Sequence, residues 1–172
     1  MIGTPPTGRL SRTDLERRFN ALLAEHGASL GRLAASYARG SERDDLFQDI
    51  VMAIWQALPR FRGECSERTF VFRIAHNRSI THIARHRPAT LDADEVMGLR
   101  DERPDPETAM AKEQQGRRLF DAVHRLPMIY RQVVTLTLEG LGYGDIADIL
   151  GITESNVGAR LTRARQMLRR SL

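Results

Sequence analysis

The chain has 172 residues, of which 41% are hydrophobic and 28% are charged, and its formal net charge at pH 7 is +4. This composition can supply the core of one domain or of two small ones, and the positive charge suits a polyanionic partner. The single cysteine, Cys65, excludes an intramolecular disulfide and a cysteine-based zinc site. No apolar run approaches membrane-spanning length and the N-terminus lacks the features of a signal peptide, so we expect a cytoplasmic protein without direct membrane insertion.

Apolar residues at helical spacing in the first half of the chain predict three helices, over about residues 11–38, 41–57 and 69–86. Gly27 and Gly31 interrupt the first pattern and could divide that helix in two. The second helix is expected to end near Pro59, because a proline disfavours helical backbone in the residue before it. Residues 60–68 are expected to form a polar loop.

The net charge changes sign between two neighbouring stretches in the middle of the chain. Residues 60–87 hold seven arginines and two glutamates, a net charge of +5, whereas residues 88–113 hold eight acidic and three basic residues, a net charge of −5. The acidic stretch is also punctuated by prolines. Because so polar a segment cannot bury much apolar surface, we expect residues 88–106 to form a flexible linker between two domains, residues 11–87 and 107–172.

The second half of the chain shows helical patterns over about residues 106–125 and 127–140, followed by two helices joined by a turn over residues 143–165. Gly151 lies where the chain must turn sharply, and Thr153 is placed to cap the helix that follows. The apolar residues of that last helix share one face: Val157, Leu161, Ala164 and Leu168. Its polar residues point roughly the other way: Thr162, Arg163, Gln166 and Arg170.

Two helices joined by a tight turn, the second with an apolar inner face and a basic outer face, are typical of a helix-turn-helix whose second helix fits the major groove of DNA. An ordinary helical hairpin with solvent-exposed arginines would show similar amphipathicity. No strand pattern is present in the sequence. The expected fold class is therefore all-α, with two small helical domains, an acidic flexible linker and a C-terminal helix-turn-helix.

Several segments, in this order and spacing, resemble those of a bacterial extracytoplasmic-function (ECF) sigma factor, the small type that keeps only sigma regions two and four. They are Asp44–Trp55 (DDLFQDIVMAIW), Phe61–Glu64 (FRGE), Thr69–Asn77 (TFVFRIAHN), Leu126-Pro127 with Arg131, Glu139–Leu141 (EGL), Ile146-Ala147 and Arg160–Arg165 (RLTRAR). The chain departs from the family pattern at Phe70, where a tryptophan is usual, at Thr81, where an acid is usual, and at Gly158, where a basic or polar residue is frequent.

The resemblance implies two surfaces for promoter DNA. The recognition helix would meet the upstream, minus-thirty-five element, with Arg160 and Arg165 closer to phosphates than to bases. The residues of this surface are Ser155, Asn156, Ala159, Arg160, Thr162, Arg163 and Arg165. The polar loop and the helix after it would melt and bind the minus-ten element, with aromatic and cationic side chains that replace lost base stacking. The residues of this second surface are Phe61, Arg62, Glu64, Arg73, His76, Asn77 and Arg78.

A third surface, on the exposed side of the helix over residues 44–57, would dock on a coiled coil of the large polymerase subunit. Its candidate residues are Asp45, Gln48 and Asp49, although the sequence alone describes only a solvated acidic face. Phe70, Phe72 and Trp55 have a second interpretation as core residues, because aromatics at helical spacing often pack inside. No carboxylate or cysteine completes a metal site around His82 and His86, so we expect no metal and no cofactor.

The resemblance therefore predicts an alternative sigma factor that binds core RNA polymerase, directs initiation at specific promoters and is controlled by an anti-sigma protein. No nucleophile–base set or phosphate loop is present, so we expect neither an enzyme nor a small-molecule substrate. One alternative is a stand-alone helix-turn-helix regulator, which would bind as a dimer and would not need the basic loop. Another is a sigma mimic that sequesters an anti-sigma protein, but residues 154–172 keep five arginines against one glutamate.

Overall fold

The computed structural model describes residues 11–86 and 110–171, and these residues form seven α-helices, one short 3-10 turn and no strand. The first domain consists of α1 (Arg12–Tyr37), α2 (Gly40–Ala57) and α3 (Glu67–His86), with the 3-10 turn Leu58–Arg60 after α2. Each of its three helices packs on the other two. Their shared core is fully buried and includes Leu30, Leu33, Leu46, Ile50, Ile54 and Phe72.

The helix α1 runs without a break through Gly27 and Gly31, so these glycines do not divide it into two helices. Its buried face, which includes Leu22, Leu30 and Leu33, continues on both sides of the two glycines. A glycine inside a helix costs about 1 kcal/mol relative to alanine, and tertiary packing of a long apolar face outweighs that preference.

The helix α3 begins at Glu67, two residues earlier than the sequence predicts. The Ser66 hydroxyl accepts a hydrogen bond from the backbone N–H of Thr69 at 3.0 Å, which satisfies one of the free donors at the start of the helix. This cap fixes where the loop ends and the helix begins.

The second domain consists of α4 (Met110–Arg125), α5 (Met128–Leu138), α6 (Tyr143–Leu150) and α7 (Glu154–Ser171). The helix α7 packs on α5 and α6, and Val133, Leu136, Ile146 and Val157 form the buried centre. Gly151 ends α6 with a left-handed φ of +66°. The Thr153 hydroxyl accepts from the backbone N–H of Asn156 at 3.2 Å, so the turn and cap of the helix-turn-helix are confirmed.

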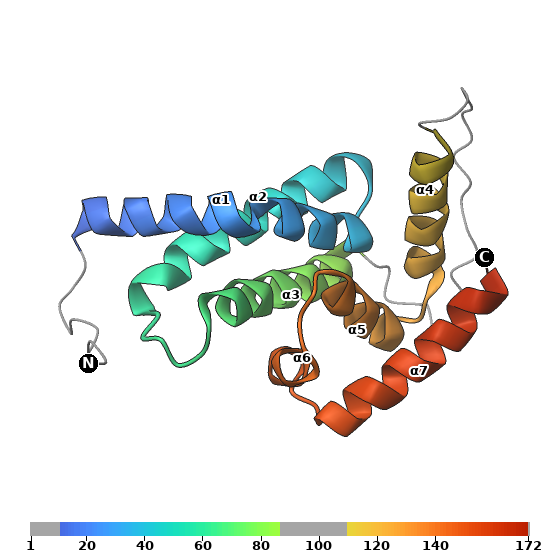
Figure 1. Cartoon of the computed structure of the whole chain (residues 1–172). Coiled ribbons are helices and arrows are strands. Elements are labelled where there is room, and N and C mark those ends of the chain that lie inside the picture. The colour runs from blue at the N-terminus through green and yellow to red at the C-terminus, as the bar shows by residue number, and fades with distance from the viewer. Residues whose placement is uncertain (1–10, 87–109, 172) are drawn as a thin grey trace.

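The two domains are in contact. The helix α3 lies against α6, and α1 lies against α4 and α5 (Figure 1). The helix α7 crosses the far side of the second domain and turns one long face away from the first domain (Figure 1). The all-α fold class is confirmed for the described residues, whereas the expected linker over 88–106 lies outside them.

Candidate nucleic-acid interface

The recognition helix α7 has one buried and one exposed face, as the periodicity predicts. Val157, Leu161 and Ala164 are buried against the neighbouring helices. The candidate residues outside this apolar stripe are exposed, with Arg160 half-buried: Ser155, Asn156, Ala159, Arg160, Thr162, Arg163 and Arg165. Arg160 donates from Nε to Oδ1 of Asn156 at 2.9 Å, which orients both side chains along the helix. The face is therefore available to a duplex.

The loop before α3 exposes Arg62 and Glu64 and keeps Phe61 half-buried. The ring of Phe61 packs on that of Phe70 with centroids 4.3 Å apart, so the first aromatic of the loop rests on the first turn of α3. Phe72 is fully buried and belongs to the core.

The candidates on α3 separate onto two faces. Asn77 and Arg78 are exposed and Arg73 is half-buried, whereas His76 is only 7% exposed. His76 shares the buried face of α3 with Phe72 and Ser79 at helical spacing, so its imidazole is not on the surface with Asn77, contrary to its expected role in contacting DNA. Burial lowers the pKa of His76 to about 4, which keeps the ring neutral near pH 7.

The candidate polymerase surface lies on α2. Asp45, Gln48 and Asp49 are exposed and follow one another at helical spacing, while Leu46 and Ile50 on the opposite side are fully buried. The side chain of Met52, which the sequence analysis did not single out for this surface, is also exposed. The exposed side of α2 thus carries an acidic face with the apolar side chain of Met52 close to it in the sequence.

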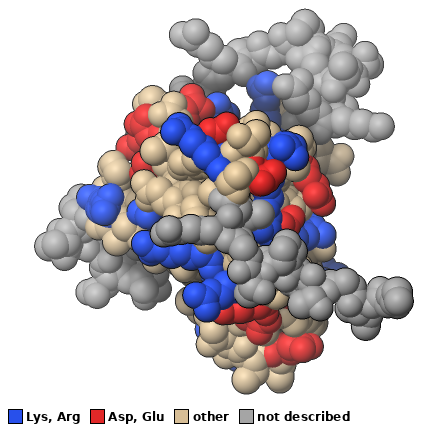
Figure 2. Space-filling view, turned by 90° about the vertical axis from the view of Figure 1, so that its left-hand side faces the viewer, with Lys and Arg blue, Asp and Glu red and all other residues tan. Residues whose placement is uncertain are grey.

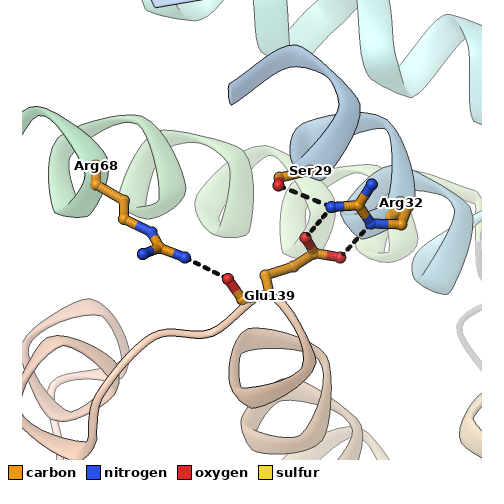
Figure 3. A network of polar contacts seen from close by, with 4 residues as sticks. All are labelled: Ser29, Arg32, Arg68 and Glu139. Carbon is orange, nitrogen blue, oxygen red and sulfur yellow. Dashed lines mark hydrogen bonds and ion pairs between the residues drawn. The ribbon is translucent and has the colours of Figure 1, made fainter. Parts of the chain in front are cut away.

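One network of polar contacts between the domains converges on Glu139, the C-cap of α5, which lies in the turn that leads to α6 (Figure 3). Its carboxylate accepts two hydrogen bonds from Arg32 of α1, and Ser29 accepts a third from the same guanidinium. Its backbone carbonyl accepts a hydrogen bond from Arg68 of α3. The hydrogen bond with Glu139 raises the pKa of Arg32 above its ordinary value.

Further polar contacts join the two domains on either side of this network. The hydroxyl of Thr69 donates to Asp145 of α6 at 3.0 Å. On the opposite side, Arg39 pairs with Asp121 of α4 at 3.0 Å. The second domain therefore contacts the first turn of α3, which follows the candidate minus-ten loop. Sequence reasoning missed these pairs because their members are far apart in the chain and each looks like an ordinary surface residue.

Charge is mixed on the face that Figure 2 shows. Basic side chains run across the middle of this face, and acidic side chains lie above and below them. In the part of the chain that the structure describes, no helix is long and apolar enough to cross a membrane.

The chain thus combines a helix-turn-helix that exposes a basic face with a second helical domain that exposes a polar loop. Residues 22–89 match the family model of sigma-70 region 2, and residues 116–168 match that of sigma-70 region 4. The chain is 30% identical to the ECF RNA polymerase sigma-E factor of Haemophilus influenzae over 164 residues, which cover 89% of this chain and 86% of that protein. It is 28% identical to the sigma-E factor of Escherichia coli K12, with coverage of 89% and 85%.

Solved structures agree with this assignment. The structure of CnrH in complex with the cytosolic domain of CnrY matches with a TM-score of 0.66 and 27% identity, over 90% of this chain and 86% of that chain. The sigma factor RpoE of Bartonella quintana, crystallised with the anti-sigma factor NepR, has the same fold, with a TM-score of 0.65, 18% identity and coverage of 92% and 96%. The chain belongs to the ECF sigma factors of the sigma-70 family, proteins that bind core RNA polymerase and direct it to promoter DNA.

Proposed function

We propose that this chain initiates transcription at its own set of promoters by binding the upstream element with α7 and opening the downstream element with α3 and its loop. The observation that carries the proposal is the exposed polar face of α7, which is backed by a fully packed apolar stripe. It acts as a subunit of cytoplasmic RNA polymerase and not as an enzyme itself. Its regions two and four correspond to residues 11–87 and 107–172.

At the upstream element, we assign base contacts to the exposed residues Asn156, Thr162 and Arg163, with Ser155 and Ala159 beside them at the helix surface. An arginine can donate two hydrogen bonds to a guanine edge, which contributes about 1–3 kcal/mol of discrimination. Arg160 and Arg165 would contact phosphates, which sets affinity and salt dependence but carries no sequence information.

At the downstream element, we assign strand binding to Phe61, Arg62, Glu64, Asn77 and Arg78, with Arg73 as a further cationic contact. An amide such as Asn77 can hydrogen-bond an unpaired base, and the basic loop supplies attraction for the backbone. His76 is left out of this assignment because it is buried. Asp45, Gln48 and Asp49 remain the proposed contact with the polymerase.

The docked arrangement of the domains has a consequence for promoter binding. The two promoter elements are named for positions about 25 base pairs apart, which is about 85 Å of duplex at 3.4 Å per base pair. A compact chain of 172 residues has a radius of gyration of about 16 Å. Two domains joined through α3 and α6 are too close together to reach both elements, so they must separate on the polymerase.

We further propose that an anti-sigma protein controls this chain. The support is its likeness to CnrH, whose solved structure contains the cytosolic domain of CnrY. A partner that binds the docked arrangement of the domains better than the separated one would shift the population toward the docked state, and fewer molecules could then span a promoter.

The decisive experiment is in vitro transcription with purified core polymerase over a promoter library. We expect initiation at a defined promoter class that requires the chain and both elements. Binding to core without specific initiation would instead support a sigma mimic. Sequence-specific DNA binding as a dimer, without core binding, would support a stand-alone regulator.

A further inference from the structure

Arg18 of α1 contacts both ends of the loop that precedes α3. Its guanidinium carbon lies 5.2 Å from the ring centroid of Phe61, the residue at which the loop begins. Its Nε and Nη2 atoms lie 2.7 and 2.6 Å from Oε1 of Glu67, the first residue of α3. One side chain from a different helix therefore joins the first residue of the loop to the first residue of the helix that follows it.

The contacts of Arg18 are better shielded from water than those of a typical surface ion pair. Its side chain is 30% exposed, and the Phe61 ring beneath it packs at a tilt on the ring of Phe70. An arginine over an aromatic face gains energy from the ring quadrupole, and partial burial weakens the competition from water. The planar guanidinium can use its face for the ring and its edge for the carboxylate at the same time.

The loop held in this way is short and has one fixed kink. Gly63 has a φ of +78°, a conformation that glycine adopts without a Cβ clash, and Arg62 and Glu64 on either side of it are exposed. Joining the two ends of the loop limits the conformations it can adopt when no DNA is bound, so less entropy is lost when the loop grips a strand.

We propose that Arg18 is a positioning residue for the opening of the promoter: it clamps the loop in the shape that binds the separated minus-ten strand, without contacting DNA itself. This inference rests on the proposed function of the loop. It predicts that losing the clamp weakens binding of the single strand while leaving binding to the polymerase and to the upstream duplex unchanged.

The test measures the affinity of reconstituted holoenzyme for a fluorescent single-stranded oligonucleotide that carries the non-template minus-ten sequence of a promoter from the library. We expect Arg18→Ala to weaken this affinity about fivefold, the combined effect of one cation–aromatic contact and one part-buried ion pair. Arg18→Lys keeps the charge but not the planar fork and should give an intermediate value. Arg17→Ala is the matched control, because Arg17 is the next residue of α1 and pairs only with the exposed Asp14 among the contacts of the described residues.

A companion variant separates the clamp from the function of the loop. Arg62→Ala removes an exposed cation within the loop and should weaken strand binding whatever Arg18 does. If Arg62→Ala weakens binding of the single strand and Arg18→Ala does not, the proposed role of Arg18 is wrong and the assignment of the loop to strand binding stands. If Arg62→Ala has no effect, the loop does not bind the strand, and both ideas are rejected. Equal losses for strand, upstream duplex and polymerase in Arg18→Ala would show a general folding defect and overturn the positioning role.

Discussion

Arg32 and Glu139 form a two-point ion pair between the domains, with Nε–Oε1 and Nη2–Oε2 distances of 2.9 and 2.7 Å, although 107 residues separate them in the chain. The Glu139 side chain is only 5% exposed, whereas that of Arg32 is 55% exposed. The arginine therefore covers a carboxylate that would otherwise be buried without a cationic partner. Such a carboxylate regains water most easily when the two domains separate.

We expect Arg32→Ala to open the free protein. Removing the partner of a nearly buried carboxylate favours separation, and the exposure of Arg32 limits the effect to about 1 kcal/mol, roughly a fivefold shift in the equilibrium. Small-angle X-ray scattering should show a larger radius of gyration for the variant than for the wild type. Arg12→Ala, which removes an exposed pair with Glu16 within α1, should leave the scattering curve unchanged. A curve for Arg32→Ala that overlays the wild type would show that the pair does not hold the domains together.

Arg163→Ala should remove the preference for one base at one position of the upstream element. A lost bidentate contact with a base would reduce discrimination there by about 1–3 kcal/mol. The measurement is a competition binding assay with duplexes substituted at each position of the element. Arg165→Ala is the matched control from the same helix, and it should weaken all duplexes alike and lower the salt slope by about one. An unchanged preference in Arg163→Ala would rule out this residue as a base contact.

Asn77→Ala should reduce strand opening without changing binding to the polymerase. Asn77 is exposed in the middle of α3, where its amide can hydrogen-bond an unpaired base. Permanganate reactivity of thymines in the downstream element reports opening directly. Reactivity equal to the wild type would exclude Asn77 from the melting surface.

Two glycines of the helix-turn-helix should respond in opposite directions to alanine. Gly158 lies within α7, and a Cβ there would meet only Tyr143 at an ordinary 3.5 Å, so Gly158→Ala should stabilise the fold by about 0.5–1 kcal/mol. Gly151 has a φ of +66°, which strains a residue with a Cβ, so Gly151→Ala should destabilise by about 1 kcal/mol or more. Thermal unfolding of the two variants gives the sign of each effect, and equal shifts would contradict the backbone argument.

The buried His76 should make stability fall in mild acid. Its pKa is lowered to about 4 in the fold by burial, against an ordinary value of 6.5 when unfolded. Between these values the unfolded chain binds a proton that the folded chain does not, so the free energy of unfolding decreases as pH falls from 6.5 toward 4. The loss from pH 7 to pH 5 should be about 2 kcal/mol. Denaturant unfolding at several pH values measures it, and His76→Leu should flatten the slope.

Most helices, and the turn and cap of the helix-turn-helix, followed from local information in the sequence. Apolar spacing, Gly151 and Thr153 predicted the helix-turn-helix, because helix periodicity and turn chemistry depend on residues only a few positions apart. The short motifs also pointed to the ECF sigma family, and the comparisons with sigma-70 regions 2 and 4 confirm this. The two glycines of α1 did not interrupt the helix, because packing along its whole length outweighed the low helix propensity of glycine.

Only the tertiary structure decided which faces meet. It buried His76 beside Phe72, placed Arg18 across the ends of the loop and brought Arg32 onto Glu139. The contacts of Arg18 and Arg32 have no local signature, since each depends on how helices distant in the chain pack. Helical spacing puts His76 on the same face as Phe72, but which face of α3 is covered depends on that packing as well. A single charged residue on a helix looks the same in the sequence whether its partner is water, a neighbouring turn or another domain.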